Sequence, residues 1–371
     1  MRYVQGMHGG ELSRAAASFG IKAENLTDFS GNANVFAAEI TRRLCRGAPY
    51  PFINYPASDC GGLCAAIAAH EAVQPENVLC GNGAAELIWL VLRVLAPQSV
   101  LFLGPVFSEW IRACNALGIG CQIITPPAEG EFACTGEILN RLWESRAELA
   151  VLCSPNNPGG ITYYNLGNIL AVLRTPRVLV DLSYREFLHG KPEYVWHSWP
   201  ALHGARGRGT EIYSLHSFTK FFCCPGIRLG YLVGERRSIA GLAAQTPAWS
   251  IGTFAQNMGL AFLEHLDEYW NSLKELVPAR YDLGANLWRM EPLDQELLLE
   301  GPNFFCCGLR REERESGRKG RAGKLQNELL RQGVLVRDCD NIPGMPPGFV
   351  RIQVRGRDDN EKLLHALRKI R

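Results

Sequence analysis

The middle of the chain alternates short runs of apolar residues with longer segments in which apolar residues recur at helical spacing. The apolar runs have the length of strands, and most are nearly free of polar side chains, as in strands buried on both faces of a sheet. Because strands separated by helices imply right-handed crossovers, the region predicts an α/β fold around a mostly parallel sheet. The runs lie at 99–103, 121–125, 149–153, 178–181, 212–215 and 229–233, and the helical segments near 84–95, 106–117, 136–146 and 165–173.

The pattern changes after about residue 250. Helical spacing continues there with few breakers over 253–298, and it returns at 359–370. Three strand candidates lie between these segments, at 303–309, 333–338 and 349–355. Helices beside a small sheet predict a second, smaller α+β domain. We therefore expect an N-terminal arm with a short helix at 1–30, a large domain at 31–250 and a small C-terminal domain at 251–371.

Composition and charge exclude several classes of protein. Of the 371 residues, 47% are apolar and 20% are charged, which is typical of a globular chain and not of a disordered, collagen-like or coiled-coil one. The net charge of +2 provides no bulk field to hold nucleic acid or an anionic membrane. The charged segment at 311–324 mixes acids with bases, which favours a solvated loop leading into a helix over a nucleic-acid site.

Cysteine and histidine usage bears on the compartment and on metals. The thirteen cysteines are irregularly spaced and form no CxxC pair, so we expect free thiols in a cytoplasmic protein. The eight histidines are scattered without the spacing of a ligand cluster, so we expect no metal site. The first residues contain no apolar segment typical of a secretory signal. The longest apolar stretch, at 87–96, is broken by Arg93 and too short to cross a bilayer.

Candidate chemistry centres on Lys220. A lysine after a strand is usually a surface cation, but here Ser217 precedes it closely and Arg228 follows in a Gly-x-Arg-x-Gly-Tyr turn. This segment resembles the lysine segment of the fold-type I aminotransferases, which use pyridoxal 5'-phosphate. The resemblance implies a seven-stranded, mostly parallel sheet and a covalent bond between Lys220 and the cofactor. It also implies that Ser217 and Arg228 bind the cofactor phosphate, a dianion that needs fixed donors and a cation.

Two upstream segments fit the same resemblance in the expected order. Asn157 lies in a turn rich in Pro and Gly, and it resembles the family's asparagine that donates to the O3′ oxygen of the cofactor. Asp181 and Tyr184 resemble the aspartate that pairs with the protonated ring nitrogen and the tyrosine that also binds O3′. Without the resemblance, the first segment would be an ordinary loop and Asp181 a helix cap.

Three further positions extend the resemblance. Gly83, Ala84 and Ala85 begin a predicted helix, where free backbone N–H groups attract phosphate. Phe107 matches the aromatic residue that stacks on the pyridine ring, although a core phenylalanine would look the same. Tyr55 matches the tyrosine that reaches the cofactor phosphate of a neighbouring subunit, which implies a homodimer with shared sites.

The two ends of the chain narrow the resemblance. His8 begins a His-Gly-Gly segment, which is followed by Asp-Phe-Ser-Gly-Asn-Ala-Asn at 28–34. Farther on, Arg337 precedes an Asn-x-Pro-Gly turn, and Arg351 stands in a Phe-x-Arg-x-x-Val-Arg strand. Together these elements resemble, over essentially the whole chain, the threonine-phosphate decarboxylases of cobalamin biosynthesis, relatives of the histidinol-phosphate aminotransferases.

Carried over by position, this resemblance implies that Arg351 binds the α-carboxylate of the substrate. Arg337, His8 and Asn32 would surround the substrate phosphate, and Asn157 would also contact the substrate. Two arginines suit a ligand that carries both a carboxylate and a phosphate. A histidine on a mobile arm can close over such a ligand, whereas His8 taken alone would be a disordered terminal residue.

The implied activity is decarboxylation of L-threonine O-3-phosphate to (R)-1-amino-2-propanol O-2-phosphate, for the nucleotide loop of cobamides. Two departures from the family pattern bear on it. Leu182 and Ser183 replace Glu-Ala after Asp181, which should leave catalysis intact because that glutamate is not a cofactor ligand. Val35 and Phe36 replace Pro-Gly beside the expected phosphate pocket, which leaves the substrate less defined.

Three alternatives stay open. L-Serine O-phosphate lacks one methyl group, and a pocket discriminates a methyl by only about 1–3 kcal/mol. A histidinol-phosphate-type aminotransferase would share the fold, the cofactor and a phosphorylated substrate, and a requirement for a keto acid would identify it. A non-catalytic regulatory protein could retain the fold, but we expect no room for a DNA-binding domain in a chain of 371 residues.

Overall fold

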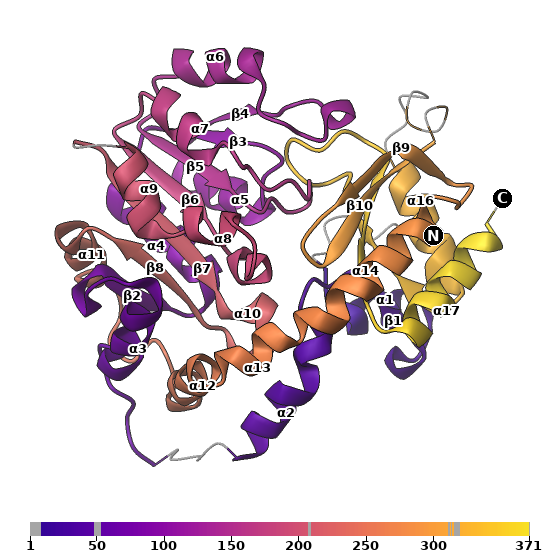
Figure 1. Cartoon of the computed structure of the whole chain (residues 1–371), viewed down its shortest axis with the longest axis horizontal. Helices are drawn as coiled ribbons and strands as arrows, with labels where there is room; N and C mark the ends of the chain where they lie inside the picture. The colour runs from indigo at the N-terminus through magenta and orange to yellow at the C-terminus, as the bar shows by residue number, and fades with distance from the viewer. Residues whose placement is uncertain are drawn as a thin grey trace.

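The structure is a computed structural model that describes residues 9–47, 53–206, 209–310, 312, 314 and 320–370. Two β-sheets dominate it, a large one built from the middle of the chain and a small one built mostly from the C-terminal third. Figure 1 shows them side by side, with the helices that follow residue 250 running from one to the other. This confirms the expected α/β architecture. The domain boundaries at 30 and 250 stay a prediction.

The large sheet has seven strands in the order β2-β8-β7-β6-β5-β3-β4. Its strands from β3 to β7 are parallel, whereas β8 runs antiparallel to both β7 and β2. Six of them occupy the predicted apolar runs within two residues at each end. The seventh, β2, was not predicted, because four residues reading Val-Leu-Cys-Gly carry too little pattern. The strands are β2 Val78–Gly81, β3 Ser99–Leu103, β4 Gly120–Ile124, β5 Leu149–Cys153, β6 Arg177–Asp181, β7 Glu211–Ser217 and β8 Gly230–Gly234.

Helices cover both faces of the large sheet, so its strands are apolar on both sides. One face packs against α4, α5 and α11, and the other against α6, α7 and α9. None of the helices in the described ranges is long and apolar enough to cross a membrane. The helices in the first 250 residues are α1 Leu12–Phe19, α2 Ala38–Gly47, α3 Gly61–Glu71, α4 Gly83–Leu95, α5 Ser108–Leu117, α6 Gly136–Glu144, α7 Leu166–Val172, α8 Glu193–Trp196, α9 Trp199–Arg206, α10 Phe218–Phe221 and α11 Arg236–Ala243.

The small sheet is antiparallel, in the order β12-β13-β10-β9. Beside it, β1 from the N-terminal segment pairs in parallel with β11. The strands are β1 Thr27–Asp28, β9 Leu293–Glu300, β10 Phe304–Leu309, β11 Val334–Leu335, β12 Arg337–Asp338 and β13 Phe349–Gln353. The remaining helices are α12 Thr253–Glu264, α13 Leu266–Asn271, α14 Leu273–Leu287, α16 Arg321–Arg331 and α17 Arg357–Arg368.

The prediction of helix over 253–298 was wrong at its end, since residues 293–300 form strand β9. Their sequence, Leu-Asp-Gln-Glu-Leu-Leu-Leu-Glu, consists largely of good helix formers. Antiparallel pairing with β10 overrides this preference, because it buries Leu293, Leu297 and Leu299 in the core. Tertiary context therefore decided the structure of this segment.

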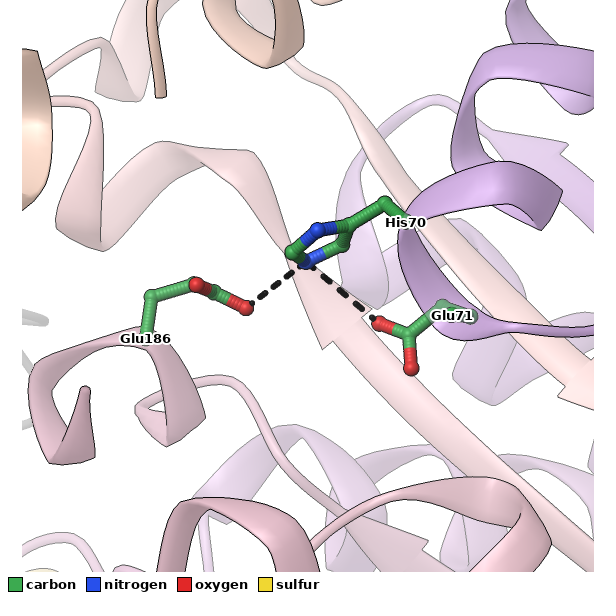
Figure 2. A group of neighbouring side chains, drawn as sticks. All are labelled: His70, Glu71 and Glu186. Atoms are coloured by element: carbon green, nitrogen blue, oxygen red, sulfur yellow. Dashed lines mark hydrogen bonds and ion pairs between the residues drawn. The ribbon is translucent and has the colours of Figure 1, made fainter. Parts of the chain in front are cut away.

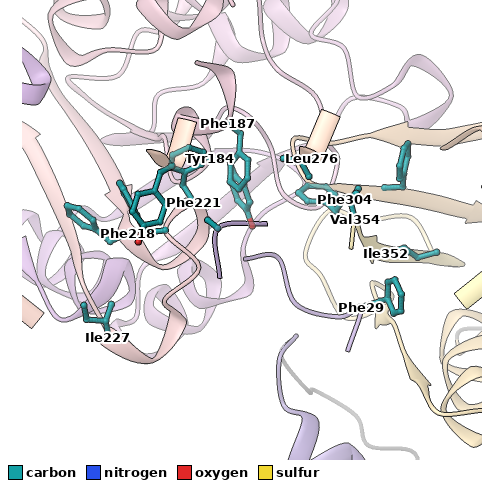
Figure 3. Packing of buried hydrophobic residues seen from close by; sticks show 14 of the residues in the cluster. Phe29, Tyr184, Phe187, Phe218, Phe221, Ile227, Leu276, Phe304, Ile352 and Val354 are labelled. Atoms are coloured by element: carbon teal, nitrogen blue, oxygen red, sulfur yellow. The ribbon is translucent and has the colours of Figure 1, made fainter. Parts of the chain in front are cut away.

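One hydrophobic core joins the two sheets. Figure 3 shows aromatic residues of the large-sheet side, among them Phe187 and Phe221, next to Phe304 and Ile352 of the small sheet. The rings of Phe187 and Phe221 pack edge to face at 5.1 Å between centroids, and Tyr184 meets Phe304 edge to face at 5.9 Å. Tyr184 also lines a cavity between the two sheets. This packing therefore holds the small sheet against the edge of the large sheet.

Candidate active site

A cavity of about 240 Å³ lies where the carboxyl ends of β5, β6 and β7 face the small sheet. In open parallel sheets, ligands bind at this edge, since the carboxyl ends of the strands meet there. Residues far apart in the sequence come together around it. Twelve of the residues expected from the sequence line the cavity: Asn32, Ala84, Ala85, Phe107, Asn157, Asp181, Tyr184, Ser217, Lys220, Arg228, Arg337 and Arg351.

Lys220 enters the cavity from α10, a single helical turn that follows β7. Ser217 caps this turn, because its hydroxyl accepts a hydrogen bond from Thr219 N–H at 3.3 Å. The backbone carbonyl of Lys220 accepts a hydrogen bond from Asn34 N–H at 2.7 Å. Burial, reinforced by the positive charges of Arg351 and Arg228, lowers the pKa of Lys220 to about 8. A larger share of this amine is therefore neutral and nucleophilic near pH 7 than for an exposed lysine.

Asp181 ends β6 at the base of the cavity. Burial holds the pKa of its carboxyl above the ordinary value, although Ser183 and the charge of Lys220 offset part of the rise. The N–H of Ser183 donates to Oδ1 of Asp181 at 3.0 Å. A buried carboxylate facing a cavity suits a cationic partner in a ligand.

Tyr184 and Asn32 connect the two sides of the cavity. Asn32 Nδ2 donates a hydrogen bond to the hydroxyl of Tyr184, and Asn303 Nδ2 donates to the carbonyl of Asn32 at 2.8 Å. Burial raises the pKa of Tyr184, so the phenol stays neutral. A neutral phenol beside an amide offers hydrogen bonds to a ligand without adding charge.

Arg351, on β13, has an incomplete set of hydrogen bonds. Its Nη1 donates to Oδ1 of Asn157 and its Nη2 donates to the carbonyl of Ser30 at 2.7 Å. The Nε atom is buried and has no hydrogen-bond partner among the residues that the structure describes. Because a buried unpaired donor is costly, the site favours a ligand that brings an acceptor such as a carboxylate. The neighbouring Asn156 has a structural role instead, since it bonds to Pro105 and Gly159.

Arg337, on β12, lies directly opposite Arg351 in the antiparallel pair. Opposed residues in such a pair project from the same face, so both guanidinium groups reach the cavity. Nη1 of Arg337 donates to the carbonyl of Asp338 at 2.5 Å, and Nη2 donates to Oδ1 of Asn341 at 2.7 Å. Two adjacent, buried guanidinium groups give this side of the cavity a concentrated positive charge.

The opposite side holds an anion cradle at the start of α4. Gly83 has φ +77°, and a Cβ added there would lie 2.4 Å from Nη2 of Arg228. The glycine does not line the cavity itself; it allows Arg228 to approach the N-terminus of the helix, where Ala84 and Ala85 do line it. Backbone N–H groups, the helix dipole and an arginine together attract a phosphate.

Comparison with known proteins shows the family of the chain. Residues 26–370 match the family described as aminotransferase class I and II. The chain belongs to this family. It is similar to the threonine-phosphate decarboxylase of Salmonella typhimurium, with 30% identity over 100% of this chain and 98% of that protein. It is also similar to the histidinol-phosphate aminotransferase of Roseiflexus castenholzii, with 26% identity over 97% and 93%.

The fold agrees with a solved structure of the same class. The structure of L-threonine-O-3-phosphate decarboxylase from Porphyromonas gingivalis matches with a TM-score of 0.72 at 20% identity, covering 93% of this chain and 98% of that one. This likeness concerns the fold. It confirms the expectation of a fold-type I transferase with a mostly parallel seven-stranded sheet.

Enzymes of the aminotransferase class I and II family depend on pyridoxal 5'-phosphate, which confirms the expected cofactor. The residues of the cavity fit it. Lys220 offers the amine for a covalent bond, and Asp181 offers a carboxylate to the ring nitrogen. The cradle that a Cβ at Gly83 would fill, with Arg228 and Ser217 beside it, suits the phosphate.

Three residues expected from the sequence of this aminotransferase-family chain differ in how they lie relative to the cavity. Phe107 lines the cavity just before α5 and is 40% exposed, as a ring that covers a ligand would be. Tyr55 is 82% exposed and does not line the cavity of its own chain; its ring lies 5.0 Å from that of Trp249. His8 lies outside the described residues, although the adjacent Gly9 lines the cavity.

Sequence reasoning missed several residues that also line the cavity. Cys153 and Ser183 were overlooked, although both follow the rule that singled out Asp181, since they lie at or just after the carboxyl end of a parallel strand. Ser108 follows Phe107 at the start of α5, and Thr219 lies between Ser217 and Lys220. Their proximity to recognised positions was the available signal.

A cluster of ionisable side chains adjoins the cavity. Figure 2 shows His70 between Glu71 and Glu186, with Nε2 of His70 at 3.1 Å from Glu186 and at 3.9 Å from Glu71. A small cavity of about 20 Å³ is lined by His70 and Glu186 and shares Ser183 with the larger one. Among the described residues, these three side chains form a group whose composition would suit a metal ion.

The acceptors of this cluster are already engaged. Arg185 Nη1 donates to both carboxylate oxygens of Glu71, at 2.8 and 2.9 Å, and the hydroxyl of Tyr231 donates to Glu71 at 2.7 Å. Trp270 Nε1 donates to Glu186 at 3.1 Å. Although burial raises the pKa of Glu186, the hydrogen bond and charge of His70 lower it to about 2. The guanidinium already supplies the cation, so the cluster is a buried ion-pair network that supports the cavity wall.

Proposed function

We propose that this protein is a pyridoxal-phosphate-dependent decarboxylase of L-threonine O-3-phosphate. Its products would be carbon dioxide and (R)-1-amino-2-propanol O-2-phosphate, which serves the nucleotide loop of cobamides. The observation that carries the proposal is the pair of arginines, Arg337 and Arg351, opposite each other on β12 and β13 and both lining the cavity. The name of the Salmonella relative, similar over the full chain, supports the same substrate.

Pyridoxal phosphate, when bound, supplies an electron sink for the pair of electrons released when a bond at the α-carbon of an amino acid breaks. The chain's own residues prepare this site. Lys220 would hold the cofactor through its amine, whose lowered pKa favours bond formation. Asp181 would place a carboxylate at the ring nitrogen, and Asn157 and Tyr184 would donate hydrogen bonds to O3′. Ser217, Arg228 and the start of α4 would bind the phosphate.

The small-sheet side then positions the substrate. Arg351 receives the α-carboxylate, since its buried Nε has no partner within the described chain. Arg337 receives the phosphate, with Asn32 beside it and His8 closing from the arm. Holding both anionic groups would fix the orientation of the bonds at the α-carbon relative to the cofactor, and so decide which of them can break. The amine of Lys220 would be placed to return a proton to the α-carbon.

Two neighbouring activities share this geometry. L-Serine O-phosphate would fit the same arginines, with about 1–3 kcal/mol at stake for the missing methyl group. The similarity to the Roseiflexus histidinol-phosphate aminotransferase favours transamination as the second candidate function. That reaction breaks the bond from the α-carbon to hydrogen and needs a keto-acid partner, whereas decarboxylation needs none.

The test is carbon dioxide release by the purified, cofactor-loaded protein in the absence of any keto acid. L-Threonine O-3-phosphate and L-serine O-phosphate are compared at equal concentration, and release from the threonine ester in excess of the serine ester is expected. Release chiefly from the serine ester would mean that L-serine O-phosphate is the substrate. No release from either, together with amino transfer from histidinol phosphate to 2-oxoglutarate, would make the protein an aminotransferase.

We also propose a cytoplasmic homodimer in which Tyr55 contributes to the partner's cofactor phosphate site. The support is an exposed apolar surface: Ile53 is 94% exposed, Tyr55 82% and Trp249 50%. The thirteen cysteines are all free, which suits a reducing compartment. Mixed dimers test the sharing. Lys220→Ala and Tyr55→Ala chains, each inactive alone, should regain activity on mixing, because one hybrid site is then intact; no recovery would contradict shared sites.

A further inference from the structure

Ser30 connects the first described residues of the chain to one of the two arginines of the cavity. Its hydroxyl accepts a hydrogen bond from Gly10 N–H at 2.9 Å, and its carbonyl accepts one from Nη2 of Arg351 at 2.7 Å. The hydroxyl in turn donates to Oδ1 of Asp28 at 2.6 Å, and the Ser30 N–H donates to the same oxygen at 2.8 Å. Ser30 is buried, so these hydrogen bonds meet little competition from water.

The small sheet fixes the position of Ser30. The preceding residue, Phe29, is fully buried, and its N–H donates to the carbonyl of Leu335 at 2.7 Å. The carbonyl of Phe29 accepts a hydrogen bond from Gln353 N–H at 2.9 Å, two residues after Arg351 on β13. The backbone of Ser30 therefore lies clamped beside the strand that carries the arginine, and its side chain offers a fixed point to any segment that packs on it.

Gly9 packs against the same carbonyl and the same guanidinium group. A Cβ added at Gly9 would lie 2.1 Å from the carbonyl oxygen of Ser30 and 3.0 Å from Nη2 of Arg351, and the first of these distances leaves no room for a side chain. Gly9 also lines the cavity, and Arg351 is only 4% exposed. The backbone of Gly9 therefore covers the guanidinium group. A covered guanidinium attracts a carboxylate more strongly, because less water screens the pair.

We propose that Ser30 is a positioning residue, whose hydroxyl holds the backbone of Gly9 and Gly10 closed over Arg351. The inference rests on the proposed function, in which Arg351 binds the α-carboxylate of the substrate. Asp28 takes part by accepting the hydroxyl proton of Ser30, which leaves a lone pair of that oxygen directed at Gly10 N–H. The Asp-Phe-Ser segment at 28–30 thereby acquires a role at the substrate side of the cavity.

The test uses two variants that disturb this contact from opposite sides, in the full-length, cofactor-loaded protein. Ser30→Ala removes the hydroxyl and keeps the carbonyl that binds Arg351. Gly9→Ala leaves Ser30 intact and adds a methyl group where the carbonyl of Ser30 leaves no room. Ser18→Ala is the matched control, since its hydroxyl donates to the carbonyl of Arg14 at 2.9 Å within α1 and does not line the cavity.

Two readouts follow the closed segment. Hydrogen–deuterium exchange of the peptide that contains Gly10, read by mass spectrometry, needs no turnover. In Ser30→Ala the Gly10 amide should exchange about 2- to 10-fold faster, the factor that one lost hydrogen bond contributes to an equilibrium. The KM for L-threonine O-3-phosphate should rise by a similar factor. The kcat and the affinity for pyridoxal phosphate should stay within about twofold, because the contacts of Ser30 lie on the small-sheet side of the cavity.

Gly9→Ala should raise both the exchange rate and the KM in the same way. The double variant should be no worse than the stronger single variant, since both substitutions break one contact. A general loss of stability would instead weaken cofactor binding and speed exchange throughout the chain, which separates a structural role from the proposed one.

The outcomes separate this inference from the proposed function. Unchanged exchange and KM in Ser30→Ala would overturn the role of Ser30, and so would faster exchange without a rise in KM. Equal effects in Ser18→Ala, or effects that simply add in the double variant, would also overturn it. Carbon dioxide release from neither phosphate ester by the wild type would instead reject the proposed function, while the exchange comparison would still decide whether Ser30 holds Gly9 and Gly10 in place.

Discussion

The two walls of the cavity differ in how they are built and in what they determine. The large-sheet wall comes from strand ends and the short turns after them, with Asp181 at the end of β6, Asn157 after β5 and Lys220 after β7. The small-sheet wall comes from an antiparallel pair that carries Arg337 and Arg351, and from the N-terminal segment that carries Asn32. The first wall suits a cofactor that a whole family shares, whereas the second carries the charges that would bind the substrate under the proposed function.

This contrast shows how one family can serve several substrates. The large-sheet wall lies among strands buried on both faces, where changes are costly. The small-sheet wall meets it through hydrogen bonds such as Arg351 to Asn157 and Asn32 to Tyr184. Substitutions on the small sheet can therefore change the ligand without dismantling the cofactor site.

The largest effect is expected on the cofactor wall. Lys220→Ala removes the amine that bonds to the cofactor, and carbon dioxide release should fall by about 10³-fold or more. The visible absorbance of the bound cofactor should also change, because the lysine–cofactor bond cannot form. Release assays and spectra on the same preparation measure both. Wild-type turnover and spectrum in this variant would reject the cofactor assignment.

On the substrate wall, Arg351→Ala should lower kcat/KM by about 30- to 5000-fold, the range for removing one partner of a buried charge pair. The loss should be specific for the carboxylate. Inhibition by the product, which has no carboxylate, should change little in comparison. If inhibition by the product weakens as much as the substrate does, Arg351 does not bind the carboxylate.

Arg337→Ala should weaken phosphorylated ligands about 10- to 100-fold more than their unphosphorylated analogues, since a phosphate loses a charged hydrogen-bond donor. The measurement compares L-threonine O-3-phosphate with L-threonine as inhibitors or substrates. Cofactor affinity, governed by the other wall, serves as the control and should stay unchanged. Equal weakening of both ligands would remove Arg337 from the phosphate site.

The last prediction concerns the stability of the cofactor-free protein and not its activity. Folding lowers the pKa of Lys220 to about 8, so the folded state disfavours the charged amine. Below that pH the cost is complete, and it is relieved as pH rises from about 8 toward the unfolded value near 10.4, because the unfolded chain then binds more protons. Lys220→Met should therefore be more stable than wild type by on the order of 3 kcal/mol at pH 7.

Denaturant unfolding of the two cofactor-free proteins at pH 7 and pH 9.5 measures this difference. The gap between variant and wild type should narrow at the higher pH. A gap that is independent of pH would mean that the methionine stabilises by packing and that the amine is not held at a cost. That result would contradict the lowered pKa of Lys220 in the cofactor-free protein.

Much of the large-sheet wall was predictable because its signals are local. The strands β3 and β5 have the predicted bounds, and Asn157, Asp181 and Lys220 lie where short motifs placed them. The exceptions are β2, which is too short to show a pattern, and Ser183, which lines the cavity from the turn after β6 and belongs to no motif that was recognised.

The small-sheet wall was less predictable. A segment rich in leucine and glutamate became strand β9 instead of helix, because its partner β10 lies beside it in the fold. Arg337 and Arg351 were singled out by resemblance, but their register across β12 and β13 could not be predicted from residue spacing. The same holds for Gly83, whose missing side chain matters because Arg228 occupies the space.

The sequence by itself indicated the α/β class, six of the seven strands of the large sheet and, through resemblance to a known family, most of the residues that line its side of the cavity. Those features depend on apolar periodicity and on contiguous motifs, which a linear chain displays directly. Only the tertiary structure decided that two arginines face one cavity, that Tyr184 meets Asn32, and that the ion-pair network around Glu71 adjoins the site. These depend on contacts between distant segments, and their energies arise only when burial brings the groups together.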